Sequence, residues 1–528
     1  MKISTPQYIV LISFISLSAF TACKKTETPV VTPTTPKEVT ATRDELTRDS
    51  IFLYAKELYY WNTSLPTYEA FKPRSYNSKE TELYAITQFS LNPTTGRPYE
   101  YVSGSTEPKY SFFDEGTTGT TAALKADVNG TETDYGFSVL YNTETDLRVK
   151  YVYPNSPASQ QGLSRGCKIT AVNTQTNLTY NSSNVTFLNS ALFGTNASVT
   201  LTFTDLAGVT KTATITRATY TVNPILYTNV YTSGIKKVGY IVFNSYTNNA
   251  SAAISAAFAG FASQGVTEVI LDLRYNGGGY VSTATQIINI LGPAAQTGNI
   301  MYTSYYNAFL QGLTTAQRKA SVLAQQPLTD DAGKLQTFTG GVNGKYATYA
   351  DLDYSSTSAD NIEKFEKSGA LNLSRVYFIV TSATASASEL TINSLKPVMD
   401  VKLIGTTTYG KPVGFFPIKI DKVDMYIPEF ETKNQIGIGG YYDGLSVDKT
   451  AFEDLTKAWG DESETLLSYA LLYAKTGSFV LPAAKTASLS AQSTKMPARL
   501  SVAELKLVSE SLDQNSFKGM VKEPRRKF

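Results

Sequence analysis

The stretch that most constrains the fold is residues 375–395, where a strand pattern, a turn of small residues and a helix pattern follow one another. Arg375–Val380 is a short apolar run rich in β-branched and aromatic residues, which is typical of a buried strand. Glu389–Leu395 has apolar residues at helical spacing. Ser386 lies between them, so we expect it at a strand-to-helix turn, beside the free backbone N–H groups of a helix start.

A second strand, turn and helix are indicated upstream. Val269–Arg274 reads as a buried strand, Tyr275–Tyr280 as a glycine-rich turn and Ser282–Ile288 as a helix. Three adjacent glycines allow a backbone that presents N–H groups to a developing oxyanion. A glycine triplet alone is more often a tight turn or a phosphate-loop lookalike, and no Gly-Lys-Ser or Gly-Lys-Thr is present here to support nucleotide binding.

The chemistry of the first turn is restricted by the absence of histidine from all 528 residues. A serine hydroxyl needs a base to become a good nucleophile, and the imidazole base of a Ser-His-Asp triad is excluded. Lys411 follows Ser386 by 25 residues. An ammonium in an apolar pocket loses solvation, which lowers its pKa and frees the amine to act as a base. The pattern indicates a serine–lysine hydrolase; the alternative is a simple loop with a helix cap.

Three motifs together resemble those of the C-terminal processing peptidases, also called tail-specific proteases, of the serine–lysine type. They are Asp272–Gly279, Ser386–Glu389 and the pair Gly410-Lys411. The resemblance implies that Ser386 is the nucleophile and Lys411 the general base. It also implies an oxyanion hole formed by the backbone N–H groups of Gly278 and Ala387, with Gly277 as the alternative to Gly278.

One position departs from the family pattern. Many members carry a polar residue four positions after the lysine, where it helps to orient the amine, and this chain has Phe415. Glu389, Ser388 and Tyr409 are close enough in sequence to orient Lys411. Their alternative roles are a helix-start carboxylate, a helix cap and a core aromatic ring, respectively.

Residues 133–222 resemble a PDZ domain. In that family the loop at Tyr135, Gly136 and Phe137 would bind a peptide carboxylate through backbone N–H groups, while the peptide adds a strand to a sheet edge. The alternative is a strand start packed in a β-rich core. Cys167 stands where the family usually has Asp, and we expect it to be a small core residue.

The chain opens with a pattern typical of an exported lipoprotein. An apolar segment from Tyr8 to Phe20 is too short to span a bilayer, and Phe20-Thr21-Ala22-Cys23 resembles a lipobox. We expect Cys23 to carry the lipid that anchors the mature protein to a membrane of a bacterial cell envelope. Cleavage after Ala22 by an ordinary signal peptidase is the alternative.

We expect an α/β (mixed α+β) multidomain fold. The predicted parts are a signal peptide (1–22), a Thr/Pro-rich tether (23–44), an N-terminal helical region (45–132), the PDZ-like domain (133–222), the peptidase domain (223–477) and a flexible C-terminal tail (478–528) with a short helix at 501–512. The polar insertion 302–360 is expected to form a lid or rim over the cleft.

The amino-acid composition mainly limits the kinds of molecule that the chain is expected to bind. With 47 Lys and Arg against 45 Asp and Glu, nothing suggests a nucleic-acid partner. We expect protein or peptide substrates, no cofactor and no metal; the oligomeric state is not legible. Two rival functions remain: a catalytically silent peptide-binding lipoprotein, raised by Phe415, and a glycan-binding surface lipoprotein, raised by the abundant tyrosines.

Overall fold

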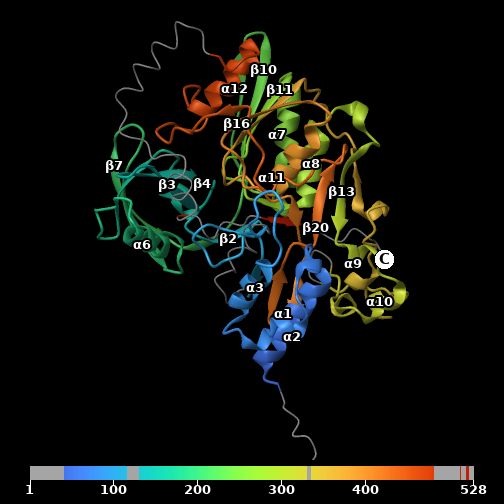
Figure 1. Ribbon diagram of the computed structural model, residues 1–528. Coiled ribbons are helices and arrows are strands. Elements are labelled where there is room, and N and C mark those ends of the chain that lie inside the picture. The colour runs from blue at the N-terminus through green and yellow to red at the C-terminus, as the bar shows by residue number, and fades with distance from the viewer. Residues whose placement is uncertain (1–40, 116–129, 330–333, 481–511, 513–518, 523–528) are drawn as a thin grey trace, which may run out of the picture. The chain divides into compact units, whose positions relative to one another are not determined.

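The computed structural model describes residues 41–115, 130–329, 334–480, 512 and 519–522 (Figure 1). The chain divides into a short unit, Met1–Thr42, and a main unit, Arg43–Phe528, to which the following description applies. The predicted signal peptide and Cys23 lie outside the described residues. Among the helices of the described part, none is long and apolar enough to cross a bilayer.

A six-stranded sheet forms the centre of the region predicted to be catalytic, residues 223–477. Its strands are, in spatial order, β21 (Lys449–Thr450), β16 (Asp400–Gly405), β15 (Arg375–Val380), β11 (Glu268–Asp272), β10 (Lys236–Phe243) and β9 (Ile225–Ser233). Neighbours are parallel except β9 and β10. The parallel strands read as continuous apolar runs because helices cover both faces. The carboxyl ends of β11 and β15 meet at one edge, where both motif loops begin.

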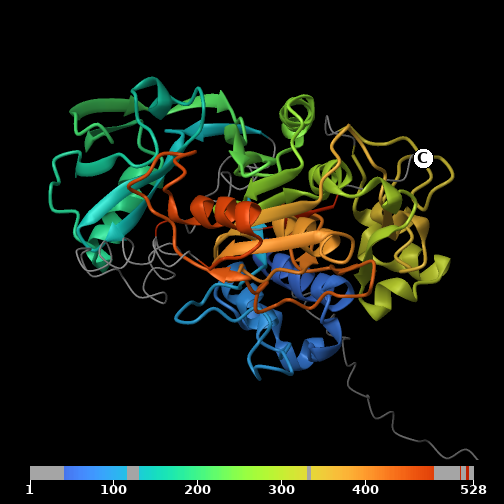
Figure 2. The same ribbon diagram turned by 90° about the horizontal axis from the view of Figure 1, so that it is seen from above.

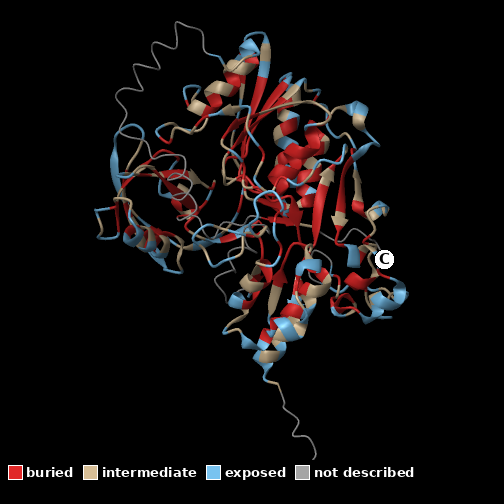
Figure 3. Cartoon of the chain, viewed as in Figure 1, coloured by how far each residue is buried: buried red, intermediate tan, exposed pale blue. Residues whose placement is uncertain are grey.

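Helices α7 (Ser251–Ser263), α8 (Val281–Leu291) and α11 (Ala387–Leu395) pack on one face of this sheet, and α12 (Thr465–Thr476) packs on the other (Figures 1 and 2). Every residue of α11 is buried. Figure 3 shows buried residues concentrated along the sheet and these inner helices. The mixed α/β fold expected from the sequence is confirmed.

Two smaller sheets extend the catalytic region. One contains β14 (Ile362–Lys364), β13 (Ile300–Tyr306), β20 (Phe430–Asn434) and β17 (Val413–Gly414); the other contains β1 (Phe112–Asp114), β19 (Val423–Tyr426) and β18 (Ile418–Ile420). Strand β1 comes from the N-terminal region, so that region contributes a strand as well as helices.

The N-terminal helices share one hydrophobic core with the insertion after β13. These helices are α1 (Arg43–Leu58), α2 (Tyr68–Phe71) and α3 (Lys79–Thr87), and the insertion carries α9 (Ala308–Gln311) and α10 (Thr315–Ala320). Ile51 and Phe52 of α1 belong to the same buried cluster as Leu310 and Leu323. The insertion 302–360, expected to form a lid or rim over the cleft, begins as strand β13 and shares apolar core residues with α1.

The segment 133–222, which the sequence predicts to be PDZ-like and which keeps that name below, holds a five-stranded sheet with its own core. Its strands are, in spatial order, β3 (Phe137–Thr143), β4 (Asp146–Val152), β5 (Lys168–Val172), β6 (Ser198–Thr204) and β7 (Thr210–Thr216). Two helices, α5 (Pro157–Gln160) and α6 (Ser182–Phe193), complete it, and β2 (Thr131–Asp134) pairs with β8 (Ala218–Thr221). Cys167 is buried as a free thiol within this core. Strand β3 is at one edge of the sheet.

The C-terminal segment departs from expectation where it is described. Residues Gly519–Val521 form strand β22, which pairs in parallel with β12 (Gly278–Tyr280). Leu512 is fully buried in the hydrophobic cluster of the PDZ-like region. The expectation of a flexible tail over 478–528 is therefore wrong at these residues, because backbone pairing and apolar burial fix them. The helix predicted at 501–512 lies outside the described residues except for Leu512.

Candidate active site

The two motif loops interlock at the carboxyl ends of β11 and β15. The backbone N–H of Ala385 donates to the carbonyl of Asn276 at 3.0 Å, and Ser388 Oγ donates to the same carbonyl at 3.1 Å. Thr384 Oγ1 donates to the carbonyl of Leu273 at 2.7 Å. These cross-links hold the glycine-rich turn against the turn that carries Ser386.

Ser386 lies on a sharp turn with a strained backbone conformation, and it is fully buried. It is the residue before α11, with φ 58° and ψ −109°. A non-glycine residue at positive φ is strained by of the order of 1–3 kcal/mol and needs surrounding contacts to hold it there. Its Oγ is buried and has no hydrogen-bond partner among the described residues. The hydroxyl is therefore not committed to a structural bond.

Glu389 ties the serine loop to the lysine loop. Its Oε2 accepts hydrogen bonds from the backbone N–H groups of Ser386 and Lys411, both at 2.8 Å. Its Oε1 accepts from the backbone N–H of Gly410 at 2.7 Å and from Thr408 Oγ1 at 2.5 Å. Burial raises the pKa of Glu389 while these four donors oppose that rise. One carboxylate thus fixes the backbones of both predicted catalytic residues.

Lys411 is fully buried, and burial lowers the pKa of its amine from 10.5 to about 7. The nearby carboxylates Glu100 and Glu389 oppose this fall but do not cancel it. The Nζ atom lies 4.1 Å from the centroid of the Phe415 ring and 5.5 Å from that of Tyr110. Phe415, the departure from the family pattern, therefore contacts the amine with its ring face, an arrangement that favours the charged form.

Three residues were considered as orienters of the Lys411 amine. Glu389 binds the backbone N–H of Lys411, whereas Ser388 Oγ donates to the carbonyl of Asn276 and Tyr409 OH donates to the carbonyl of Lys109 at 2.8 Å.

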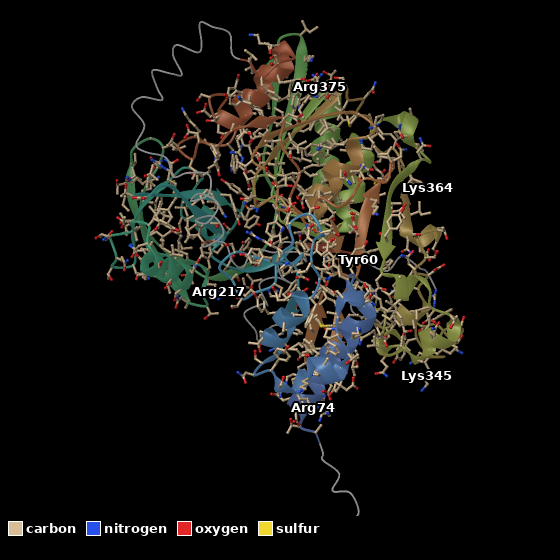
Figure 4. All side chains as sticks on the ribbon, viewed as in Figure 1. Tyr60, Arg74, Arg217, Lys345, Lys364 and Arg375 are labelled. Atoms are coloured by element: carbon tan, nitrogen blue, oxygen red, sulfur yellow. The ribbon has the colours of Figure 1, made fainter. Side chains whose placement is uncertain are left out.

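The N-terminal region forms a wall of the lysine site that sequence reasoning missed. Tyr110 OH donates to the carbonyl of Gly410 at 2.6 Å, and Lys109 Nζ donates to the carbonyl of Tyr442 at 2.9 Å. Buried Glu100 accepts from the backbone N–H groups of Tyr110 at 3.0 Å and Ser111 at 2.8 Å. Further out, Tyr60, which Figure 4 labels, donates its OH to Glu431 on β20 at 3.0 Å. This wall contributes to the full burial of Lys411.

Glu429 is a second residue that the sequence did not single out. It is fully buried; its Oε2 accepts from the backbone N–H of Phe416 at 2.9 Å, and its Oε1 has no partner among the described residues. Burial raises the pKa of this carboxyl well above its usual value, and Lys411 counters part of that rise. Burial therefore favours the neutral form of Glu429 near the amine.

The predicted oxyanion donors lie beside Ser386. Gly278 has φ 113°, and a Cβ built on it would stand 3.1 Å from both the nitrogen of Ala387 and the Cβ of Ser386. A side chain is therefore excluded there by conformation and by space. The backbone N–H of Gly278 currently donates to Asn276 Oδ1 at 2.9 Å. An oxyanion would have to replace that amide oxygen.

The predicted peptide-binding residues are in the PDZ-like core, not in the catalytic loops. Tyr135 and Phe137 are buried, and Phe137 begins edge strand β3. The backbone N–H of Gly136 donates to Asp134 Oδ1 at 2.7 Å. A peptide carboxylate at this loop would have to displace that side chain.

The region around the two motif loops is similar to a known family of peptidases. Residues 237–427, which contain β10, β11, β15, Ser386 and Lys411, match the description of Peptidase family S41. The match covers 237–427 alone, and within these residues it agrees with the expected resemblance to the tail-specific proteases.

The S41 domain has curated relatives with low identity. The chain is 26% identical over 181 residues to a chloroplastic C-terminal processing peptidase of Tetradesmus obliquus, covering 32% of this chain and 39% of that protein. It is 24% identical over 290 residues to a carboxyl-terminal-processing protease of Picosynechococcus, covering 55% and 56%. The chain thus spans less than two thirds of either relative.

A crystal structure of a putative S41 protease from Bacteroides fragilis shares the fold, with a TM-score of 0.53, 23% identity and coverage of 81% of this chain and 97% of that one.

Proposed function

We propose that this chain is a serine endopeptidase in which Ser386 is the nucleophile and Lys411 the general base. One observation carries the proposal: Glu389 Oε2 holds the backbones of both residues, while burial brings the amine pKa to about 7. A free amine at neutral pH can accept the serine proton, which a surface lysine cannot do.

The reaction follows from these positions. Lys411 Nζ takes the proton from Ser386 Oγ as that oxygen attacks the substrate carbonyl carbon. The backbone N–H groups of Ala387 and Gly278 then stabilise the oxyanion. The ammonium returns its proton to the leaving amine, which forms the acyl-enzyme, and a water deprotonated by Lys411 releases the acid. No hydrogen bond joins Ser386 Oγ to a described residue, so substrate binding must bring hydroxyl and amine together.

The proposed substrates are exported proteins or peptides bound through a C-terminus or an extended segment. The curated relatives are named as C-terminal processing enzymes, and edge strand β3 can accept an added strand. A free peptide carboxylate should bind more tightly than its amide only if it displaces Asp134 from Gly136. Calorimetry on the full chain carrying Ser386→Ala measures the affinity of both peptide forms. Tighter binding of the free carboxylate would indicate recognition of a C-terminus, and equal binding would indicate recognition of internal segments.

The proposed location is the surface of a bacterial membrane, with a lipid on Cys23. The lipobox-like sequence supports this part of the proposal.

The test of catalysis is hydrolysis of an unstructured protein by a soluble form that starts at residue 24. Ser386→Ala and Lys411→Ala should each abolish activity, and the double variant should be no worse, since the pair works as one unit. Lys411→Arg should also be inactive because a guanidinium does not give up its proton. Circular dichroism controls for folding. Near-native turnover by a folded Lys411→Ala variant would contradict the assignment.

A catalytically silent peptide-binding protein is the second candidate, supported by the bond between the Gly278 N–H and Asn276. A serine-reactive probe separates the two: labelling of Ser386 that is lost in Lys411→Ala supports the enzyme, and no labelling supports the silent binder.

A further inference from the structure

Strand β22 occupies an edge of the glycine-rich strand that otherwise would be open. On one side β12 is held by Tyr246, whose N–H donates to the carbonyl of Gly278 at 2.9 Å and whose carbonyl accepts from Tyr280 at 2.8 Å. On the other side the N–H of Gly519 donates to the carbonyl of Gly277 at 3.0 Å. An extended peptide commonly binds to such an edge by adding a strand.

The opposite edge of β22 is bonded to the lysine loop. The N–H of Phe415 donates to the carbonyl of Met520 at 3.1 Å, and the N–H of Lys522 donates to the carbonyl of Phe415 at 3.3 Å. Residues 519–522 therefore lie between the loop that carries Gly278 and the loop that carries Lys411, and the strand position that they occupy is called the groove below.

Each side chain of the segment has its own site in this groove. Met520 is fully buried in the hydrophobic cluster that contains Ala387 and Leu390. Val521 packs against the aromatic pair Phe415 and Tyr426. Because successive side chains of a strand point to opposite faces, Lys522 lies on the same face as Met520.

Lys522 binds in a polar pocket at the end of β13. Its Nζ donates to Asn361 Oδ1 at 2.9 Å and to the hydroxyls of Ser304 and Tyr306, both at 3.3 Å. Asn361 is 4% exposed, and its Nδ2 donates to the carbonyls of Asp353 at 2.6 Å and Ser355 at 3.0 Å. Those two bonds fix the amide so that its oxygen faces the pocket. The rings of Tyr306 and Phe430 add cation–π contacts at 5.3 and 5.6 Å.

The segment lies beside the nucleophile in an arrangement that does not support reaction. A Cβ built on Gly278 would be 2.3 Å from the carbonyl oxygen of Gly519 and 3.1 Å from Cβ of Ser386. The N–H of Gly278, however, donates to Asn276 and not to that carbonyl oxygen. An oxyanion formed there would lack one of its two proposed donors.

We propose that residues 519–522 are an intramolecular inhibitor that occupies the substrate groove, and that the pocket of Asn361, Ser304 and Tyr306 is a subsite for a lysine or arginine side chain. The groove takes extended segments with a small residue, two apolar residues and a basic residue in that order. The inference rests on the proposed peptidase function, because it names the occupant of the same groove.

The first test measures binding and needs no turnover. A fluorescent peptide with the sequence of residues 516–523 is titrated against the full soluble chain carrying Ser386→Ala, with and without Lys522→Ala. The Lys522→Ala chain should bind the peptide about tenfold more tightly, because loss of a charge-assisted bond empties the groove. Lys522→Arg should leave binding weak, and Lys211→Ala, a lysine exposed on β7, should match the parent.

The subsite is tested with a second peptide that has alanine in place of the lysine at position 522. It should bind the Lys522→Ala chain about tenfold less tightly than the first peptide. Asn361→Ala, added to that chain, should remove most of this difference, and circular dichroism should show a native fold. Equal affinity of both peptides, or equal affinity of the chains with Lys522 and Lys522→Ala, overturns the inference.

Kinetics separate this inference from the proposed function. In the active chain Lys522→Ala should lower KM for an unstructured protein by about tenfold with kcat unchanged, as release of a competitor requires. If the peptide binds as expected but no variant hydrolyses protein, the groove assignment stands and the peptidase function fails. If the active chain, but not Ser386→Ala, loses residues after 519, as seen by intact mass, the segment is a substrate and its inhibitory role is overturned.

Discussion

At the scale of single residues, the buried amine of Lys411 sets the pH dependence of the proposed reaction. Its pKa is about 7, lowered by burial from 10.5, and only the neutral amine accepts the serine proton. The value of kcat/KM should therefore rise with pH through an apparent pKa near 7. Phe415→Leu should shift this rise to lower pH, because the ring face stabilises the ammonium and leucine does not.

The measurement is a pH series of kcat/KM at constant ionic strength for the parent and for Phe415→Leu. Phe112→Leu is a suitable control, since that ring contacts Phe415 with centroids 5.6 Å apart and has no cation–π contact of its own with Lys411 among those identified. A flat profile between pH 6 and 9 would show that Lys411 is not the base.

The strained backbone of Ser386 gives a prediction on stability. At φ 58° a Cβ is unfavourable, so Ser386→Gly should unfold at a higher temperature than Ser386→Ala, by the equivalent of about 1 kcal/mol. Both variants should be inactive. Thermal denaturation at one pH measures the difference, and Ser388→Gly against Ser388→Ala, within helix α11, should show the opposite order. A Ser386→Gly protein less stable than Ser386→Ala would mean that the turn is not strained.

At the scale of elements, buried charges connect the PDZ-like region to the glycine-rich loop. Arg165, just before β5, donates to Tyr275 OH at 2.9 Å and to Glu453 at 2.7 Å. Next to it Arg274 pairs with Asp272 at 2.7 Å and with Glu464 at 3.2 Å. Burial alone would raise the pKa of Glu464, but Arg274 and Arg165 together lower it to about 2.

Removal of Arg165 should therefore affect both stability and catalysis. Arg165→Ala removes the closer guanidinium from half-buried Glu453, which keeps Tyr275 and, at 3.5 Å, Arg274 as partners. The loss of this charge-assisted bond costs about 2 kcal/mol and loosens Tyr275, one residue before Asn276. We expect a lower melting temperature and a fall in kcat of about tenfold. Arg217→Ala, which removes an arginine bonded to the Thr133 carbonyl in the same region, should change neither by much (Figure 4). Equal effects of the two substitutions would show that the charge network does not connect the regions.

The elements that the sequence predicted are those with a strong local pattern. The apolar runs at 269–274 and 375–380 became β11 and β15, and the helical spacing after Ser386 became α11, because strand and helix periods are local properties. The N-terminal helical region expected from residue 45 opens with α1, which ends at Leu58, and the next residue, Tyr59, bonds buried Glu100. Strand β22 gave no signal, because three residues that pair with a strand over 200 positions away carry no pattern of their own.

The site was predicted only where a motif marked it. Ser386, Lys411 and the glycine loop were predicted from their motifs and spacing, and their catalytic roles remain part of the proposal. The bonds from Lys109 and Tyr110 to residues 410 and 442 cross about 300 positions, so only the folded chain reveals them. Glu429 was missed for the same reason: burial, not sequence context, makes its carboxyl unusual.

At the scale of the whole molecule, the proposed anchor determines where the groove can act. Because Cys23 follows a short apolar segment and a small residue, Cys23→Ala should release the protein from the membrane fraction or block its maturation. One acyl chain binds membranes only marginally, so stable attachment needs the several chains of a bacterial lipoprotein. Cys167→Ala is the matched control, since the chain has 2 cysteines and this one is buried in the PDZ-like core.

Fractionation of cells and mass spectrometry of the mature N-terminus provide the measurement. The parent and Cys167→Ala should stay with the membrane and carry lipid on residue 23, whereas Cys23→Ala should not. Recovery of the parent in the soluble fraction, with no lipid on residue 23, would mean that the N-terminal segment is removed by an ordinary signal peptidase. The enzyme would then meet its substrates in solution, and the tether of residues 23–44 would not limit its reach to the membrane surface.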